Sequence, residues 1–596
     1  MPVLPERKDI VMEKHLFTLP LLLVFSLLTA CGSGSKSPTD SDDFFVPSDL
    51  GNVTGDPFDP ERLMIVQISM PKSEFQTLSS QGRTLDTGLS SCPSHDFEYD
   101  TFNAKVNIDG TVLNDVVIRK KGYLGSLSPT KPSLKLDFDE SVEGRLFKGL
   151  KRMTLNNNRQ DPTHARQCLA YSLYAQAGIK VPRCSLAKVY VNGEEMGVYT
   201  HVESIKKPFL ERVFNNKEGN LYEAQLSDFG QQLNSTFELK TNKTANDRSD
   251  LSAVANALAL SNDGEFLTAI EGVVALDEFI TYWAMDSITG NWDSATGNAN
   301  NYYVYHHPDD GLFHYIPWGL DAAFTGSNIL KPSSGPLYRS NRLAKRLFSI
   351  DSTRAQYYDR ISQLLTDIWN PSNLIQEINT VQQLTDAPQD AVNVLKTFIS
   401  GDSSNNISSQ AQTLQQAIND DGADQIDYTL ADTAPNCDTI NTTNLTANFE
   451  ADDSADKGTF HFKLENNTQI TANIYWVSLD ASNTDSITSR TDTTTLPNTK
   501  AITLIGVDQA SVFDGDNPPD VYVLQVSVET PSYGTQPVSL HGFANSLMLF
   551  KFISEGNLEL IASGRSGSIS FSSAGEGTNS SPIKGSILAS MGYFQP

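Results

Sequence analysis

Three polar side chains between positions 290 and 325 are of the types that bind metal ions and phosphate. Asp293 and Asn298 lie in a loop-like stretch rich in Gly and Asn, and Asp321 follows the next predicted hairpin. Carboxylate and amide oxygens are ligands that Mg²⁺ accepts beside phosphate oxygens. This loop and hairpin therefore predict a magnesium–phosphate site. Asx turns at Asp293 and Asn298 and a helix cap at Asp321 are the alternative explanation of the same residues.

Phosphate also needs cationic partners, and three lie on two predicted strands. Residues 133–138 alternate between polar and apolar side chains, so Lys135 projects from the polar face of its strand. Arg119 and Lys121 leave a neighbouring strand, and Glu203 is available to pair with one of the three cations. We expect these residues to bind phosphate; charges that are merely solvated on strand surfaces are the alternative.

The elements that must position these residues are visible as turns and periodic segments. Asp109-Gly110, Asn192-Gly193 and Asp309-Asp310-Gly311 each separate two β-prone segments, which predicts three hairpins. Their strands are 102–108 with 112–118, 186–191 with 196–201, and 301–305 with 312–318. A further strand is expected at 63–68. Apolar residues at helical spacing predict helices within the following segments: 72–80, 163–177, 205–214, 250–290 and 340–420.

The N-terminus has the pattern of an export signal. Residues 16–30 are almost wholly apolar but too few to span a bilayer, and Leu28-Thr29-Ala30-Cys31 resembles a bacterial lipobox. We expect 1–31 to hold a lipoprotein signal peptide and a lipid-modified Cys31, followed by a flexible tether at 32–58. The protein would then be anchored by its lipid in the cell envelope, and Gly32 favours the outer membrane. A buried apolar helix is the alternative.

Export would place the remaining cysteines in an oxidising compartment. Cys92, Cys168, Cys184 and Cys437 allow three full pairings. Cys168 and Cys184 flank a helix–turn–strand stretch and are able to meet, whereas four separate thiols are the alternative. The cysteine and histidine spacings do not indicate a zinc site.

Composition limits the partners and divides the chain. Of 596 residues 39% are hydrophobic, which is enough for sizeable cores, and the formal net charge is −27. This charge repels phosphate backbones and argues against a general nucleic-acid binder, although a metal ion can offset it locally for a nucleotide. Near residue 430 the chain becomes rich in Thr, Ser and Asn, with short alternating runs. We expect a separate all-β, sandwich-like domain at 436–596.

The chain before that change resembles the CotH (spore coat protein H) family through many short motifs in the family's order. The motifs are Val117–Gly122, Lys131–Asp139, Gly149–Asn158, Val191–Glu194, Gly219–Tyr222, Asn291–Ser294 and Asn301–Tyr305. The resemblance spans about residues 60–425. It implies an α+β, atypical protein-kinase-like domain at 59–430, with an N-lobe at about 59–205 and a C-lobe at about 206–430.

The resemblance implies an activity as well as a fold. Members of the family in spore-forming bacteria phosphorylate coat proteins with ATP and a divalent metal. Carried over, Asp293 is the catalytic base, Asn298 and Asn301 supply amides, and Asp321 holds Mg²⁺ or Mn²⁺. The Asp293–Asn298 spacing is similar to that of the kinase catalytic loop, and Glu203 would form the kinase-type Lys–Glu pair with Lys135, Arg119 or Lys121.

The sequence departs from the family pattern at two places. Gly319 stands directly after Trp318, where spore-coat members have Asp, and Asp321 lies two residues later. An offset of two residues on an extended strand restores the same face, so Asp321 is expected to replace the family residue. The family's Gly-Asn-Ser-Ser stretch is altered to Gly122-Tyr123-Leu124-Gly125-Ser126.

Three functions remain open. The first is a lipid-anchored phosphotransferase that acts on envelope or extracellular proteins, where ATP is scarce. The second is a kinase fold retained as a cell-surface binding or adhesion module for a partner protein, which Gly319 and the β domain favour. The third is hydrolysis by a carboxylate pair, which only common Asp and Glu residues support. Convergence of Asp293, Asn298 and Asp321 with Lys135 or Arg119 on one cleft would favour the enzyme.

Overall fold

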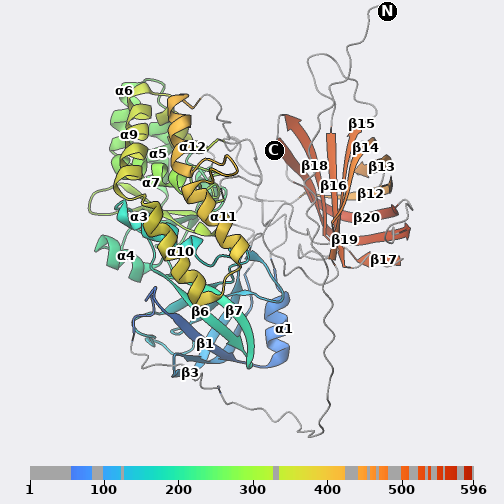
Figure 1. The fold of residues 1–596 in the computed structure, drawn as a ribbon, viewed down its shortest axis with the longest axis horizontal. Coiled ribbons are helices and arrows are strands. Elements are labelled where there is room, and N and C mark those ends of the chain that lie inside the picture. Colours follow the sequence, from blue (N-terminus) through green and yellow to red (C-terminus); the bar gives the residue numbers. More distant parts are fainter. Residues whose placement is uncertain are drawn as a thin grey trace, which may run out of the picture. The chain divides into compact units, whose positions relative to one another are not determined.

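The computed structural model describes the N-terminal two thirds of the chain in most detail. It covers residue 44, residues 55–422 without 83–97, 123–125, 232 and 326–334, and the strands between 441 and 593. Helices and sheets are mixed, as expected for an α+β protein (Figure 1). The predicted signal peptide, Cys31 and most of the tether lie outside the described residues. Within the described residues no helix is long and apolar enough to cross a membrane.

Seven strands form a closed barrel in the order β1-β2-β3-β4-β5-β7-β6. They are β1 (Leu63–Ser69), β2 (Thr101–Ile108), β3 (Thr111–Lys121), β4 (Ser133–Asp137), β5 (Arg152–Asn156), β6 (Cys184–Val191) and β7 (Glu194–Val202). Neighbours are antiparallel except β1 and β6, whose parallel pairing closes the barrel. A short helix, α1 (Lys72–Ser80), follows β1.

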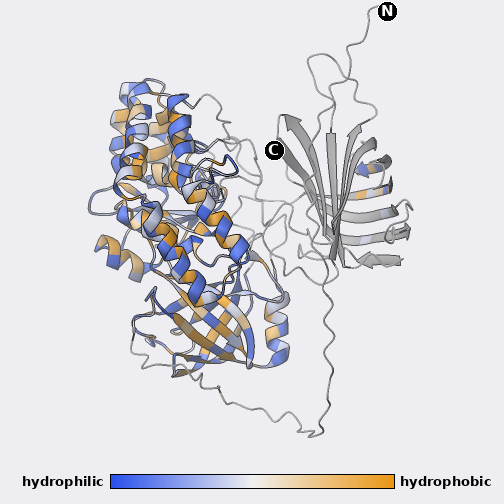
Figure 2. Cartoon of the chain, viewed as in Figure 1, coloured by the Kyte–Doolittle hydropathy of each residue, from blue (hydrophilic) through white to orange (hydrophobic). Residues whose placement is uncertain are grey.

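The two hairpins predicted in this region are confirmed, and local backbone geometry explains them. Asp109 and Gly110 have φ of 48° and 84°, and Asn192 and Gly193 have φ of 52° and 82°. Two consecutive positive φ angles define the turn whose twist matches that of the flanking strands, and Asn-Gly and Asp-Gly adopt it at low cost. The barrel interior is apolar because every second strand residue points inward (Figure 2).

The alternation predicted for β4 is confirmed, but its polar face is not a solvent-facing surface. Leu134 and Leu136 belong to the barrel core. On the opposite face Ser133 and Asp137 are also buried, and Lys135 is only partly exposed. The outer side of β4 is therefore largely covered around Lys135, whereas Arg152 on β5 remains accessible to solvent.

A second, helical region encloses a four-stranded sheet in the order β11-β10-β8-β9. The strands are β8 (Asn220–Ala224), β9 (Glu238–Leu239), β10 (Tyr302–His306) and β11 (Phe313–Pro317). The helices are α3 (Arg166–Gln176), α4 (Lys207–Phe214), α5 (Ser249–Leu258), α6 (Asp263–Glu271), α7 (Leu276–Ile288), α8 (Arg342–Phe348), α9 (Asp351–Asp367), α10 (Pro371–Thr385), α11 (Gln389–Ser400) and α12 (Gln410–Asn419).

This sheet is buried on both faces, which fixes the β10–β11 hairpin in place. Tyr302 and Val304 belong to the large core formed with α3, α7 and α9, whereas Tyr303 and Tyr305 pack in a smaller cluster against α4. The hairpin predicted around residues 309–311 is thereby confirmed. Because its strands are held from both sides, the residues just before β10 and just after β11 have defined positions.

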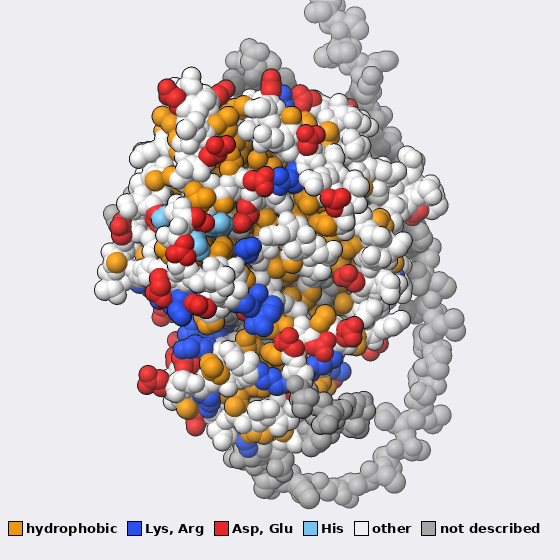
Figure 3. All heavy atoms as spheres, turned by 90° about the vertical axis from the view of Figure 1, so that its left-hand side faces the viewer, with side chains coloured by type: hydrophobic (Ala, Val, Ile, Leu, Met, Phe, Trp, Pro, Cys, Tyr) orange, Lys and Arg blue, Asp and Glu red, His pale blue; other side chains and the backbone are white. Residues whose placement is uncertain are grey.

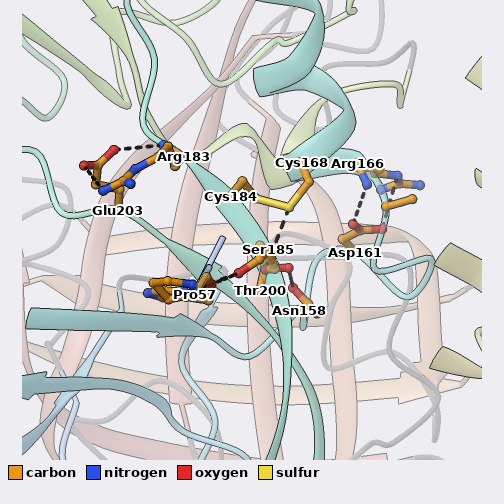
Figure 4. Close-up of a disulfide and its surroundings, with 12 residues drawn as sticks. Pro57, Asn158, Asp161, Arg166, Cys168, Arg183, Cys184, Ser185, Thr200 and Glu203 are labelled. Carbon is orange, nitrogen blue, oxygen red and sulfur yellow. Dashed lines mark hydrogen bonds and ion pairs between the residues drawn. A yellow bond between two sulfur atoms is a disulfide. The ribbon is translucent and has the colours of Figure 1, made fainter. Parts of the chain in front are cut away.

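A disulfide joins α3 to the barrel. Cys168 and Cys184 are bonded, with their Cα atoms 5.3 Å apart, which confirms the pairing that the sequence allowed (Figure 4). Helix α3 packs in the core of the helical region, so the bond ties this region to β6. Cys92 and Cys437 lie outside the described residues.

Nine strands follow residue 440 and belong to one sheet. They are β12 (Asn441–Asp452), β13 (Lys457–Leu464), β14 (Gln469–Asp480), β15 (Thr499–Asp508), β16 (Val521–Glu529), β17 (Gly534–Pro537), β18 (Ser546–Ser554), β19 (Asn557–Ser573) and β20 (Ile583–Tyr593). Apart from β17 they pair in a closed circle, since β20 contacts both β12 and β19. The predicted β content is confirmed; a sandwich of two sheets is not, and the independence of this segment stays a prediction.

Candidate functional site

Asp293 is carried by the loop between α7 and β10, and this loop folds tightly upon itself. A Cβ atom at Gly297 would lie 2.1 Å from the carbonyl oxygen of Trp292, so only glycine fits there. The backbone amide of Ser340 donates to the carbonyl oxygen of Thr296 at 2.7 Å. The backbone amide of Ser227 donates to the carbonyl oxygen of Ala299 at 2.9 Å. The loop is therefore bound on several sides and presents Asp293 in one position.

Three asparagine amides surround the Asp293 carboxylate. Asn298 and Asn300 donate to Oδ1 at 2.8 and 2.9 Å, and Asn301 donates to Oδ2 at 2.5 Å. Burial raises the pKa of Asp293, and the amides of Asn300 and Asn298 oppose this shift. A carboxylate offers about four acceptor directions, so one stays available for a hydroxyl donor. An Asx turn does not explain these contacts, because all three donors are side-chain amides and none is the backbone amide two residues on.

The hairpin returns the chain from Asp293 to Asp321. The amide of Trp318 donates to the carbonyl of Asn301 at 3.2 Å, so the two ends of the hairpin meet. Asp321 is 7% exposed and accepts a bond of 3.3 Å from the side chain of Asn156 on β5. It lies within a short 3₁₀ turn after Gly319 and does not cap a helix.

Electrostatics place Asp321 near both Asp293 and a barrel lysine. Burial raises the pKa of Asp321 to about 6, the Lys121 ammonium and the Asn156 amide lower it, and the charge of Asp293 raises it further. Asp321 in turn favours the charged form of Lys121, whose pKa burial lowers. Asp321 therefore lies between the carboxylate of Asp293 and a cation that the barrel supplies.

The cations of the barrel form one group beside these carboxylates. Arg119 and Lys135 are paired neighbours across β3 and β4. Burial lowers the pKa of Lys135 to about 7, and the charges of Arg119, Lys206 and Arg152 lower it as well. None of Arg119, Lys121 and Lys135 forms an ion pair with any residue that the structure describes. Figure 3 shows that several Lys and Arg side chains gather on one face of this strongly acidic protein.

The expectation for Glu203 is wrong. Its carboxylate forms ion pairs with Arg183 at 2.9 Å, shown in Figure 4, and with Arg212 at 2.5 Å. Glu203 follows directly after β7, and the charges that act on it are those of Arg183 and Arg212. The carboxylate that influences Lys121 and Lys135 is Glu223 on β8, which the sequence interpretation missed.

Glu223 is held in the helical region and faces the barrel cations. It forms an ion pair with Lys240 at 2.5 Å, and its charge favours the protonated forms of Lys121, Lys135 and Lys206. Neighbouring cations lower the pKa of Glu223 to about 2, although burial acts in the opposite direction. Glu223 therefore acts on Lys121 and Lys135 through its charge, while its ion pair among the described residues is with Lys240.

The donor set fits a divalent metal bound to phosphate. Among the described residues, the buried Oδ1 atom of Asn298 has no hydrogen-bond partner and Asp321 accepts one side-chain bond, which leaves oxygen atoms for a hard cation. In the described part of the chain no cluster of three or more His, Cys, Asp or Glu side chains is placed to hold a metal ion. A metal at this site would therefore rely on Asp321, amide oxygens and the phosphate itself.

Some site residues gave little or no signal in the sequence. Asn156, Lys206 and Glu223 reach the site from β5, from the start of α4 and from β8, far from residue 293 in the chain. Asn300 was the one that could have been found, because it lies between the two selected asparagines. The structure brings together Asp293, Asn298, Asn301 and Asp321, and electrostatics link this group to the cations Lys121, Lys135 and Arg119.

Introducing the spore-coat residue at position 319 is expected to damage the protein. Gly319 has φ of 58°, and a Cβ there would come within 3.0 Å of the Asn301 side chain. Gly319→Asp should lower the free energy of unfolding by about 1–3 kcal/mol and lower activity, since it displaces an amide that orients Asp293. Chemical denaturation measures the first effect. Gly311→Asp is the control, because its φ is 73° with no atom within 4 Å. Equal stability of the two variants with higher activity of Gly319→Asp would contradict this expectation.

Comparisons with known proteins agree with the resemblance. Residues 118–421 match the model of the family described as CotH kinase protein. The inner spore coat protein H of Bacillus subtilis (strain 168) is 25% identical over 190 residues, which cover 30% of this chain and 52% of that protein. The chain thus spans about half the length of the curated relative that it matches. A crystal structure of a Helicobacter pylori proinflammatory kinase, CtkA, aligns at 11% identity with a TM-score of 0.28, over 50% of this chain and 95% of that chain.

Proposed function

The chain belongs to the CotH kinase protein family, and from this premise we propose that it transfers the γ-phosphate of ATP to hydroxyl groups of envelope or extracellular proteins, with Mg²⁺ or Mn²⁺. The observation that carries the proposal is that the buried Asp321 carboxylate interacts electrostatically with Asp293 on one side and with Lys121 on the other. Phosphoryl transfer needs a group that orients and deprotonates the acceptor, a carboxylate for the metal, and cations for the phosphate oxygens. These three residues supply one of each.

Each residue has a defined task in this proposal. Asp293 accepts the hydrogen bond of the acceptor hydroxyl in its remaining acceptor direction and takes the proton as the oxygen attacks phosphorus. Asp321 and the free Oδ1 of Asn298 hold the metal ion, which when bound neutralises charge on the phosphate oxygens. Lys121 and Lys135 face the phosphate oxygens, with Arg119 beside them.

The test is label transfer from γ-labelled ATP by the purified protein. We expect incorporation of label into the protein itself or into an added acceptor protein, dependent on Mg²⁺ or Mn²⁺ and abolished by a chelator. Incorporation that does not require a divalent metal, or no incorporation with any acceptor from the same cell envelope, would contradict the proposal.

At pH 8 the protein is expected to take up a proton on the Lys135 amine when it binds a nucleotide. The pKa of Lys135 lies at about 7 instead of 10.5, because of burial and the charges of Arg119, Lys206 and Arg152, which Glu223 only partly offsets. The amine is therefore mostly neutral at pH 8 in the free protein and mostly protonated at pH 6. A phosphate beside it favours the ammonium form, so binding should weaken as the pH rises through 7.

Titration calorimetry in buffers of different ionisation enthalpy measures this proton uptake. We expect an uptake of up to about one proton at pH 8 and much less at pH 6. Lys135→Arg is the matched control, because a guanidinium stays protonated at both pH values and should remove the uptake. Equal uptake in wild type and Lys135→Arg would show that Lys135 does not meet the phosphate.

A binding or adhesion module on a kinase-family fold is the second candidate. Gly319 in place of the spore-coat residue favours it, as do the three amides that already occupy Asp293. In that case the cation group would bind an anionic partner without turnover. Nucleotide binding without label transfer is the result that would select this candidate.

We also propose that the protein is exported and anchored through Cys31. The Cys168–Cys184 disulfide supports the oxidising compartment, since such bonds persist outside the cytoplasm. Replacement Cys31→Ser should move the protein from the membrane fraction to the soluble fraction, because the acylated sulfur is lost. Immunoblots of fractionated cells measure this, with Cys92→Ser as the control. Wild-type retention of Cys31→Ser in membranes would contradict the anchor.

A further inference from the structure

Asp286 is a buried carboxylate next to the loop that carries Asp293. It lies on α7, and its side chain is 0% exposed. Its Oδ1 accepts the hydroxyl of Tyr174 at 2.5 Å, and its Oδ2 accepts the hydroxyl of Thr296 at 2.7 Å and the amide of Thr296 at 3.3 Å. No cation among the described residues pairs with it. Every contact of this carboxylate is therefore with a neutral donor.

Keeping a carboxylate there is costly for folding. An ionised group out of water, without a cationic partner, loses more solvation than neutral hydrogen bonds return. Burial accordingly raises the pKa of Asp286 to about 6. Asparagine at position 286 would fill the same space with a smaller loss of solvation free energy. An apolar residue at position 286, combined with Phe at position 174, would do the same. The position of Asp286 relative to the loop offers a reason why a carboxylate stands here.

Asp286 holds the loop on both sides of Asp293. Its main-chain carbonyl accepts the amide of Asn291 at 2.9 Å, and its side chain binds Thr296. Asp293 lies between these two attachment points. Through Tyr174 the same carboxylate is also joined to α3, the helix that the disulfide ties to the barrel.

We propose that Asp286 is a positioning residue, which clamps the segment 291–296 so that Asp293 stays directed at the acceptor hydroxyl. The inference rests on the proposed phosphotransferase function. Asp286 itself touches neither nucleotide nor acceptor in this arrangement. Its loss should therefore lower kcat, because the base is less often in position, and leave the KM for ATP unchanged.

Two single variants and their combination test the clamp. Asp286→Asn retains one acceptor oxygen but removes the second, and Thr296→Val removes the hydroxyl donor on the loop. We expect each to lower kcat about 10- to 100-fold with the KM for ATP within about threefold of wild type. Because both variants break the same link, the double variant should lose no more kcat than the more severely impaired single variant. Thr296→Ser, which restores the hydroxyl, should recover kcat relative to Thr296→Val.

Asp250→Asn controls for the loss of a buried carboxylate as such. Asp250 on α5 accepts the hydroxyl of Tyr222 at 2.8 Å and has no contact with the loop. Its variant should keep kcat at the wild-type level, because the carboxylate that is lost does not hold the Asp293 loop. A kcat of Asp286→Asn within twofold of wild type, equal losses in Asp286→Asn and Asp250→Asn, or fully multiplicative losses in the double variant would overturn the proposal.

Hydrogen exchange separates this proposal from the proposed function. The amides of residues 291–298 should exchange at least about tenfold faster in Asp286→Asn than in wild type, and at the wild-type rate in Asp250→Asn. If wild type transfers no phosphate, the phosphotransferase proposal fails, while faster loop exchange still shows the clamp. If wild type is active but loop exchange is unchanged in Asp286→Asn, the clamp fails and the function stands.

Discussion

Asp293→Asn is expected to lower the rate of phosphate transfer by about 10²- to 10⁴-fold, the range for loss of a general base. The substitution keeps the shape of the side chain and one acceptor oxygen for Asn298 and Asn300, whereas Asn301 must turn its amide to face the new NH₂ group. The cations that meet the nucleotide are unaffected. The dissociation constant of ATP, measured by calorimetry, should stay within about threefold of wild type.

Asp402→Asn is the control for this experiment. Asp402 also accepts a side-chain amide, that of Asn405 at 2.7 Å, in an exposed loop between α11 and α12. Its variant should transfer phosphate at the wild-type rate. If wild type and Asp293→Asn incorporate label equally, Asp293 is not the base, even though the family and the fold remain as described.

Asp321→Asn is expected to weaken metal-dependent nucleotide binding by at least about tenfold and turnover by about 10²-fold or more. The reason is the loss of a carboxylate that accepts one side-chain bond from the described residues and so has oxygen atoms for the metal, whereas the oxygens of Asp293 are held by three amides. Titration with Mn²⁺ in the presence of ADP measures binding through the paramagnetic signal of the free ion.

The same variant is not expected to unfold the protein. An ionised carboxylate at 7% exposure is expensive in the absence of metal, and the nearby charge of Asp293 adds to this cost. The amide of Asn removes the charge, so the melting temperature without metal at pH 7.5 should equal or exceed that of wild type. Asp137→Asn, which breaks the contact with Arg152 in the barrel, should instead leave Mn²⁺ binding intact. Wild-type Mn²⁺ affinity in Asp321→Asn would remove Asp321 from the metal site.

Local chemistry was sufficient to predict most elements around the site. The Asp109-Gly110 and Asn192-Gly193 turns need positive φ angles, which few residues other than Gly, Asn and Asp adopt at low cost, so the hairpins were recognisable without tertiary information. The loop from Gly290 to Asn301 and the hairpin after it were likewise identified, because the functional residues there are close together in the sequence.

Side-chain partners between distant strands were not predictable in the same way. Glu203 follows a strand, and Glu223 lies within one. Neither the residue type nor the spacing in the sequence shows which of the two faces the barrel cations. The sheet order decides it, since Glu203 lies beside Arg183 and Arg212, while β8 carries Glu223 towards Lys121 and Lys135. Long-range pairing depends on topology, which a periodic pattern does not encode.

The sequence by itself determined the three hairpins, the family resemblance, the loop around Asp293 and the possibility of the Cys168–Cys184 bond, because these depend on turn chemistry, periodicity and residues close along the chain. Only the tertiary structure decided which side chains share a low-dielectric environment. Burial between the barrel and the helical region raises the pKa of Asp321 and lowers that of Lys135. The tertiary structure also surrounds Asp293 with three amides and places Asp286 behind the loop. The pKa of each group depends on the side chains that pack around it in space, and these come from distant parts of the chain.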